Sequence, residues 1–485
     1  MYSATDLAII TPEGFMLGAI CALLLIDLFI EQSRRGLTHF LAIATLVFAA
    51  ILTLRAPAPA AGDPIGPLHA FGGMFVRDGF SDLLKLTIHA VTIGVFVYAK
   101  PYLKSHSLFQ GEFYLLSLTG VLGMMVLVSA GNLITVYVGL ELLALSSYAL
   151  VALDRDSRLA SEAAIKYFVL GALASGMLLY GMSMIYGATG TLDLARIHAQ
   201  VAVSYDQNLL AFGLVFIVVG VAFKLGAAPF HMWVPDVYQG SPTAVTLFIA
   251  GAPKVAAFGM AYRLLEDGLS GLAADWQPML SILALLSLAI GNLVAIAQTN
   301  FKRMLAYSTI SHVGFLLLGL INGTPAGYAA ATFYAITYAI TTVAAFGMIV
   351  LLSRSGFEAD EIEDFRGLNQ RNGWYAMIML MVMASLAGVP VWVGFIAKFQ
   401  VLKAAVVSGH LWLAIAAGVF AVIGAFYYLR VIKVMYFDEP ANTGPLALPN
   451  DMPFRFVLSA NGLGLLALGV MGGPLMAWCL EAVTR

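Results

Sequence analysis

The chain is 485 residues long, and 61% of its residues are hydrophobic while only 11% are charged. An ordinary soluble domain has roughly a quarter charged residues, and apolar residues in this excess cannot all be hidden from water in a core. The composition therefore excludes a soluble enzyme and predicts a protein surrounded by lipid. A net charge of −2 without any long basic block excludes nucleic acid as the partner.

Apolar runs long enough to cross a membrane follow one another along the chain, since a bilayer core of ~30 Å needs about 20 residues of helix. The first run contains Asp27 and precedes Arg34 and Arg35, which is the wrong polarity for a cleaved signal peptide, so we expect a retained span. The sequence predicts an all-α polytopic membrane protein with about fourteen transmembrane helices. In chain order they are residues 9–30, 37–54, 79–98, 112–129, 132–152, 163–187, 209–228, 243–265, 279–297, 304–321, 327–352, 374–407, 411–434 and 456–480.

The basic residues outside these spans predict the orientation, because cytoplasmic loops of membrane proteins carry the excess of lysine and arginine. Alternate loops hold fourteen and five basic residues, which puts both termini outside the cytoplasm. The smaller set is Arg55, Arg77, Arg196, Arg263 and Arg485. The larger set is Arg34, Arg35, Lys100, Lys104, Arg155, Arg158, Lys302, Arg303, Arg354, Arg366, Arg371, Arg430, Lys433 and Arg455.

Six of the ten lysines lie in or at the edge of a predicted span. A charge at the bilayer centre costs roughly 2.5–3.5 kcal/mol on insertion scales, so such residues are functional candidates by default. Lys224 lies five residues before Pro229, and Lys398 lies eight residues after Pro390. Proline removes a backbone hydrogen bond, and discontinuous helices with free carbonyl groups form ion sites in transporters. The alternative is that both prolines only kink their helices for packing.

Two further candidates lie in mid-span: Lys254, which follows Pro253, and Glu141. Burial disfavours the charged form of both groups, so a neighbouring carboxylate and lysine can exchange a proton near neutral pH. The alternative is a static ion pair that holds two helices together.

His312 lies among hydroxyl residues, and an ordinary histidine pKa of about 6.5 suits a proton relay. The alternative is a hydrogen bond between helices. Lys166, four residues after Glu162, is either a further relay member or half of an ordinary i,i+4 pair. We interpret Lys85 and Lys403 as snorkelling residues or minor participants.

Sequence signals of a cofactor site are missing: there is no phosphate loop, dinucleotide fingerprint or close-spaced histidine pair. The two cysteines, Cys21 and Cys479, are too few for an iron–sulfur cluster. Haem bound between distant histidines such as His89 and His312 stays open. We expect an ion conductor with no cofactor or metal site of its own.

Two motifs carry a resemblance to a known family. They are residues 224–243, KLGAAPFHMWVPDVYQGSPT, and residues 302–312, KRMLAYSTISH. They are similar to the antiporter-like membrane subunits of respiratory complex I (NADH–quinone oxidoreductase) and of multi-subunit Na⁺/H⁺ antiporters. The form of residues 236–243, and a lysine rather than a glutamate at position 398, resemble the complex I branch. The resemblance covers essentially the whole chain.

The resemblance implies a proton-translocating subunit, driven by quinone reduction elsewhere in the complex. It implies that Glu141 and Lys224 exchange or modulate a proton, that Lys254 connects them to a central His312, and that the proton leaves from Lys398. Partners are then other membrane-arm subunits, including antiporter-like ones, in the bacterial inner membrane. NADH, FMN, iron–sulfur clusters and the quinone belong to other subunits. The alternative is a subunit of a multi-subunit Na⁺/H⁺ antiporter.

The resemblance also implies two five-helix repeats, each containing a proline-broken helix. Because five is an odd number, a sequential copy must be inverted in the membrane. The implied domains are three N-terminal helices (residues 1–111), the first repeat (112–265), the second repeat (266–434), and a cytoplasmic loop with a C-terminal helix (435–485).

Overall fold

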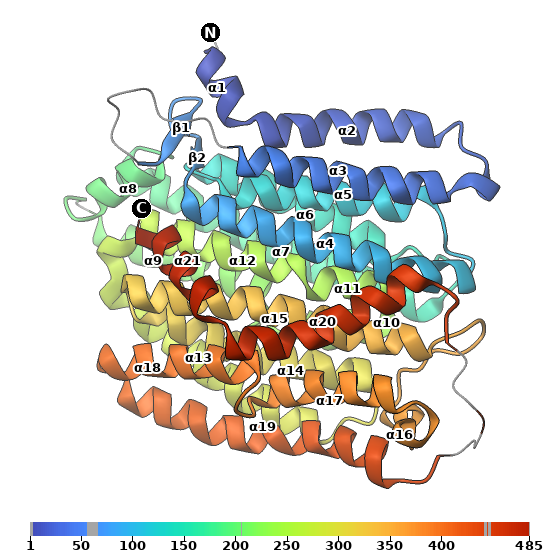
Figure 1. Cartoon of the computed structure of the whole chain (residues 1–485). Coiled ribbons are helices and arrows are strands. Elements are labelled where there is room, and N and C mark those ends of the chain that lie inside the picture. The colour runs from blue at the N-terminus through green and yellow to red at the C-terminus, as the bar shows by residue number, and fades with distance from the viewer. Residues whose placement is uncertain (1–2, 56–65, 205, 441–443, 445–447, 485) are drawn as a thin grey trace.

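The computed structural model describes residues 3–55, 66–204, 206–440, 444 and 448–484, so Arg485 lies outside the described residues. Long helices lie side by side in one bundle, as Figure 1 shows. In the described part of the chain, twelve helical segments are long and apolar enough to span a membrane. The prediction of an all-α membrane protein is confirmed, with twelve candidate spans rather than fourteen.

Two of the fourteen predicted spans are not among these twelve. The first is α2 (Thr11–Asp27), which has 17 residues and follows a short α1 (Ala4–Ile9). The second, residues 374–407, is divided into α17 (Gly373–Ala387) and α18 (Val393–Val407). The last predicted span is also interrupted, because α20 (Met452–Val470) ends before α21 (Gly473–Thr484) begins.

The N-terminal part of the chain contains the one departure from helix that the sequence did not predict. After a 3-10 turn (Gln32–Arg34) and α3 (Gly36–Leu54), strands β1 (Leu68–Ala70) and β2 (Phe75–Arg77) form an antiparallel hairpin. Gly72 and Gly73, with φ of 66° and 92°, allow its tight turn. Helix α4 (Gly79–Ser105) follows, and the Asp78 side chain caps its first turn.

The next segment contains eight α-helices and a π-helix. They are α5 (Gly111–Val128), α6 (Leu133–Val151), α7 (Arg158–Thr189), α8 (Leu194–Val201), α9 (Gln207–Leu225), α10 (Trp233–Gly240), α11 (Thr243–Ala250), α12 (Ala252–Tyr262) and the π-helix Arg263–Gly268. Small residues bring neighbouring helices close: a Cβ on Gly123 of α5 would lie 2.6 Å from the Leu143 backbone nitrogen of α6.

The second half begins with a 3-10 turn (Ser270–Leu272). It continues with α13 (Ala273–Ile296), α14 (Phe301–Ile321), α15 (Pro325–Leu352), a 3-10 turn (Ile362–Phe365), α16 (Leu368–Arg371), α17, α18 and α19 (Leu411–Phe437). Side chains of Asn300 and Thr324 cap α14 and α15.

The centre of the bundle is formed by α11, α12, α14 and α15. About nine tenths of each of these spans is buried, whereas only 33% of the α19 span and 22% of the α20 span are buried. The outer helices therefore present apolar side chains at the surface of the bundle, and the inner ones lie at its centre. Figure 1 shows both chain ends toward the same end of the bundle, with α16 and the α2–α3 connection toward the other end.

Candidate functional site: a line of buried lysines and a histidine

Two membrane helices, α9 and α17, are interrupted in the same way. Helix α9 ends at Leu225, and Gly226 (φ 81°) donates its N–H to the carbonyls of Ala222 and Phe223, at 2.9 and 3.0 Å. Helix α17 likewise ends just before a glycine, Gly388 (φ 86°), whose N–H donates to the carbonyls of Ala384 and Ser385, both at 3.0 Å. Both breaks are glycine caps in the left-handed region, which other residues rarely adopt.

The predicted breaks lie where the prolines indicated them, but the prolines do not end the helices. Pro229 and Pro390 come three and two residues after the capping glycines. Proline is common just after such a cap because it cannot continue a helix. The prolines therefore follow breaks that the glycines have already made.

A lysine ammonium group lies at the carbonyl end of each interrupted helix. Lys254 Nζ donates to the Leu225 carbonyl at 2.8 Å, and Lys398 Nζ donates to the carbonyls of Leu386 and Ala387 at 2.8 and 3.0 Å. A helix C-terminus carries partial negative charge, so it stabilises a cation there. Both lysines are buried, at 4% and 8% exposure. Their charges are compensated by backbone dipoles and not by carboxylates.

Aromatic rings cover both ammonium groups. Lys254 Nζ lies 4.8 Å from the centroid of Trp233, and Lys398 Nζ lies 5.2 Å from that of Phe315. Such contacts add cation–π attraction in a site from which water is largely excluded. Lys254 also belongs to a third interruption, since Gly251 separates α11 from α12 and Lys254 lies in the first turn of α12.

Glu141 and Lys224 make no direct contact. Lys224 lies in the last turn of α9, with Nζ 5.9 Å from the Tyr148 ring centroid. Glu141 lies in the middle of α6, and its buried Oε1 has no hydrogen-bond partner among the described residues. The two interact electrostatically, yet neither forms an ion pair within 4.0 Å in the described part of the chain. The static ion pair considered from the sequence is therefore not formed.

His312 is bonded to tyrosines on two neighbouring helices. Its Nδ1 lies 2.6 Å from the Tyr334 hydroxyl of α15, and its Nε2 lies 3.2 Å from the Tyr428 hydroxyl of α19. Tyr428 also contacts Ser308 Oγ at 2.5 Å. His312 thus links helices and lies in a hydroxyl network at once, and both alternatives from the sequence describe its geometry. Because a tyrosine hydroxyl lies within hydrogen-bond distance of each ring nitrogen, the geometry of His312 does not favour haem ligation.

Three small cavities lie beside Lys224, Lys254 and His312, and successive cavities share a lining residue. The first, of about 20 Å³, is lined by Lys224 and Lys254. The second, of about 10 Å³, is lined by Lys254 and His312. The third, also about 10 Å³, is lined by His312 and by Leu386, whose carbonyl accepts from Lys398. A cavity of roughly 10–15 Å³ holds one water molecule, so each is about large enough for a single bridging water.

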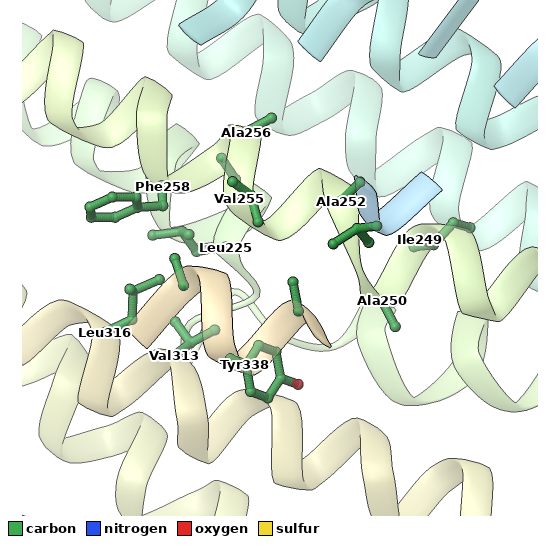
Figure 2. Close-up of a cluster of buried hydrophobic side chains, with 14 of the residues drawn as sticks. Leu225, Ile249, Ala250, Ala252, Val255, Ala256, Phe258, Val313, Leu316 and Tyr338 are labelled. Atoms are coloured by element: carbon green, nitrogen blue, oxygen red, sulfur yellow. The ribbon is translucent and has the colours of Figure 1, made fainter. Parts of the chain in front are cut away.

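Part of the surroundings of this row is apolar. Figure 2 shows buried apolar side chains of this region, among them Leu225 at the end of α9, Ala250 and Ala252 on either side of the α11–α12 interruption, Val313 of α14 and the ring of Tyr338. The Tyr338 hydroxyl donates to Thr309 at 2.7 Å and its ring lines the second cavity. Hydroxyl groups of Thr337, Tyr338, Thr341 and Ser385 also line the third cavity.

Lys166 and Glu162 lie apart from the cavities, in an ion-pair network at the surface. Lys166 Nζ is 2.9 Å from Glu162 and 2.8 Å from Asp236, and Asp236 is also 2.9 Å from Arg303. The Lys166 side chain is 45% exposed. The predicted i,i+4 pair is thus present, with Asp236 as an additional partner.

Several charges that the sequence assigned to loops or to the membrane surface are buried. The snorkelling interpretation of Lys85 is wrong, because its side chain is 0% exposed and pairs with Glu13. Lys302 is not in a loop; it is buried in the first turn of α14 and donates to the Ser241 carbonyl at 2.7 Å. Arg77 and Arg263 are each 3% exposed. Lys85, Lys302 and Arg263 each have a partner far away in the sequence, in Glu13, the Ser241 carbonyl and Asp78, so a scan of apolar runs does not find their burial.

The chain matches the protein-family model described as NADH:quinone oxidoreductase/Mrp antiporter, TM, over residues 130–424. Subunit N of the NADH-quinone oxidoreductase of Thioalkalivibrio sulfidiphilus is 54% identical over 100% of this chain and 99% of its own length. The chain belongs to the NADH-quinone oxidoreductase subunit N family. Members of this family are subunits of complex I, so the protein is a proton-translocating subunit of its membrane arm.

Solved structures agree with membership in the subunit N family. A chain of respiratory complex I from Thermus thermophilus with bound aureothin has a TM-score of 0.81 and 33% identity, covering 97% of this chain and 100% of that chain. A chain of the Mrp complex from a Dietzia species has a TM-score of 0.83 at 23% identity, covering 99% of this chain and 96% of that one. The second likeness shows a shared fold alone. The higher identities therefore lie with complex I, and not with the antiporter alternative.

Proposed function

We propose that protons cross this subunit of complex I through Glu141, Lys224, Lys254, His312 and Lys398, in that order. The observation that carries the proposal is the row of three cavities, each lined by two successive members of the route or by the carbonyl that binds the next one. A single water in each cavity would complete a path for proton transfer from Lys224 to Lys398, and Glu141 would exchange its proton with Lys224 at the start of that path. Lys166 and Glu162, at the surface, are possible additional members of the route.

The capping arrangement explains how a proton can be both held and released. A lysine that donates to the carbonyl end of an interrupted helix is stabilised while charged. When its proton leaves for the adjacent cavity, the neutral amine loses that stabilisation, so the charge state of one lysine biases the next. Quinone reduction elsewhere in the complex would shift this balance through a two-state element, and the interrupted helices α9 and α17 are suited to that role.

The proposal includes the repeats and the orientation that the sequence implied. Residues 112–265 and 266–434 would form inverted repeats, each with one interrupted helix, and the matching glycine caps of α9 and α17 support this. Both termini would lie on the periplasmic side of the bacterial inner membrane. The distribution of basic residues supports that orientation.

NADH, FMN, the iron–sulfur clusters and the quinone would be bound by other subunits. In the described part of this chain no group of histidine, cysteine or acidic residues is arranged to hold a metal ion. The proposed partners are neighbouring membrane-arm subunits, including other antiporter-like ones.

The test is proton transport by the assembled complex in sealed membrane vesicles. Lys224→Met and Glu141→Ala should abolish or sharply reduce proton uptake driven by NADH, together with the coupled quinone reductase activity, while the complex still assembles. Leu173→Met, at an exposed apolar position of α7, is a matched control that should leave both activities unchanged. Full pumping in an assembled Glu141→Ala complex would refute the route, and a strict requirement for Na⁺ would favour the antiporter alternative.

A further inference from the structure

A second group of buried charges lies in the N-terminal helices, outside the proposed route. Asp78, Asp82, Lys85 and His89 follow one another at spacings of three and four residues at the start of α4. Residues at this spacing share one face of a helix. The face is directed into the protein, because Lys85 and His89 are both 0% exposed.

Lys85 is the centre of this group. Its Nζ lies 2.8 Å from Glu13 Oε1 of α2 and 4.0 Å from Asp82 Oδ1, and it faces the Phe75 ring of β2 at 5.0 Å. Asp82, at 21% side-chain exposure, also accepts two bonds from Arg77 Nε at 3.2 Å. Asp82 is thus a member of the group that reaches the protein surface, near the β-hairpin end of the bundle.

Neighbouring elements leave the group one positive charge short. Arg263 from the π-helix pairs with Asp78 and Asp267, both at 2.8 Å. Helix α3 contributes only backbone, since the carbonyl of Thr53 accepts from Arg77 at 2.7 Å. His198 of α8 acts on Asp267 from the outside. The carboxylates are Glu13, Asp78, Asp82 and Asp267, and the cations that face them are Arg77, Lys85 and Arg263.

His89 lies one turn beyond Lys85 and has no visible structural task. Neither of its ring nitrogens has a hydrogen-bond partner among the described residues, although the side chain is fully buried. Buried polar atoms without partners are rare and costly. An ion pair that only holds α2 to α4 requires Glu13 and Lys85, but it does not require an unpartnered base beside them.

We propose that Glu13, Lys85 and His89 form a second proton-binding site, which takes up one proton from water through Asp82. The bound proton resides on a Glu13 carboxylate oxygen, 2.8 Å from Lys85 Nζ. It reaches a His89 ring nitrogen when the Lys85 side chain turns from Glu13 toward the ring, gives up one N–H proton to His89 and takes the Glu13 proton in its place. Uptake neutralises the excess negative charge of the group. On Glu13 the proton also removes the charge attraction that holds α2 to α4, so occupancy changes how firmly the outermost helix is attached.

The test uses a hydrophobic carbodiimide, which reacts with protonated carboxyl groups in apolar surroundings. The purified complex is treated between pH 5.5 and 9, and modification of Glu13 is measured by peptide mass spectrometry. Glu13 labelling should rise as the pH falls. Lys85→Met should move the midpoint up by about 1–3 pH units, as expected when a neighbouring cation is removed. His89→Gln, which keeps the size of the side chain but removes the base, should shift the midpoint as well.

Thr87→Val is the matched control, since Thr87 lies on the opposite face of α4 and bonds only to the Leu83 carbonyl. It should leave the labelling curve unchanged. Glu13 that stays unlabelled at every pH, in a complex where Glu141 is labelled, would overturn the proposal, and so would labelling that His89→Gln does not shift. If the Lys85→Met complex fails to assemble, the labelling curves of the unmodified complex and of the His89→Gln variant still test the proposal. The labelling is independent of pumping, so it separates this site from the proposed route.

Discussion

The two interrupted helices, α9 and α17, have the same backbone design and different chemistry. Each ends in a glycine cap with a lysine bonded to the last carbonyls. At α9 the lysine comes from another helix, α12, whereas Lys398 belongs to α18, the continuation of the interrupted helix itself. Two residues before the glycine, α9 has Lys224 and α17 has Leu386. The first break therefore holds two lysines, and the second holds one.

The difference indicates two kinds of site. At the first break a proton has two amines and the nearby Glu141 among which to be redistributed, and Lys254 is held by one carbonyl at 2.8 Å. At the second break Lys398 is held by two carbonyls of its own segment, with only the hydroxyl-bonded His312 behind it. We infer that the first break receives and exchanges the proton and that the second retains it until release.

The largest expected effect separates proton exchange from capping. Lys254→Arg and Lys398→Arg keep a cation that can bond to the carbonyls, but arginine does not release a proton at physiological pH. Each variant should assemble, and proton pumping should fall by about 10²–10⁴-fold, as when a positioned proton-transfer group is removed. Pumping in vesicles and the amount of assembled complex are the measurements. Normal pumping in Lys398→Arg would show that the second break needs only a fixed charge.

The capping glycines should differ in how they tolerate a side chain. Alanine at Gly226 or Gly388 must adopt a positive φ, which costs about 1–3 kcal/mol. At Gly226 the new Cβ would also lie 2.7 Å from Val234 Cγ2, while at Gly388 its nearest atom is Lys398 Cδ at 3.0 Å. We expect both variants to lower the melting temperature of the complex, Gly226→Ala by more, because a branched side chain cannot move away as easily as the lysine stem.

Gly176→Ala is the control for these variants, since Gly176 lies within α7 and a Cβ there meets nothing within 4 Å. It should be neutral or stabilise the helix by about 0.5–1 kcal/mol. Equal losses for all three alanine variants would contradict a special role for the caps.

Glu358 ties the two halves of the molecule together outside the membrane-spanning segments. It accepts hydrogen bonds from Thr243 at the start of α11 and from Tyr102 at 2.7 Å, and it lies 3.5 Å from Lys302 of α14. Burial alone would raise the pKa of Glu358, but Lys302, the two hydroxyls and His106 outweigh it and hold the pKa below its ordinary value of 4.5.

This stabilisation is present above the ordinary pKa and is lost as the pH falls through the lower value of the folded state. Glu358→Gln should therefore cost about 1–3 kcal/mol at neutral pH and should flatten the fall in melting temperature below pH 4.5. Melting curves of the purified complex between pH 3.5 and 7 measure both effects. A variant as stable as the parent at pH 7 would show that the halves do not depend on this contact.

The smallest effect is expected at Pro390. Because Gly388 already ends α17, Pro390→Ala removes no structural break and mainly gives the unfolded chain more freedom, worth about 0.4–1 kcal/mol. Pumping should stay close to normal, and the melting temperature should fall slightly. Strong loss of pumping in this variant would show that Pro390 itself is needed for the interruption between α17 and α18.

The residues of the proposed route were predictable because each is an ionisable group within an apolar run, and the cost of such a group can be judged from its neighbours in the sequence. Lys224, Lys254 and Lys398 stood out on that ground. Lys85 and Lys302 did not, although they are at least as well buried. Their burial depends on Glu13 and on the Ser241 carbonyl, which other helices bring to them.

The sequence by itself determined the class of the protein, the approximate positions of its spans, its family and the ionisable groups within the membrane. These follow from the lengths of apolar runs, from the cost of placing charge in lipid, and from motifs within single helices. The tertiary structure alone decided which carbonyls Lys254 and Lys398 bind, that glycines rather than prolines end the helices, and that small cavities lie beside Lys224, Lys254 and His312. Contacts between helices far apart in the chain depend on packing, which apolar runs do not encode one by one.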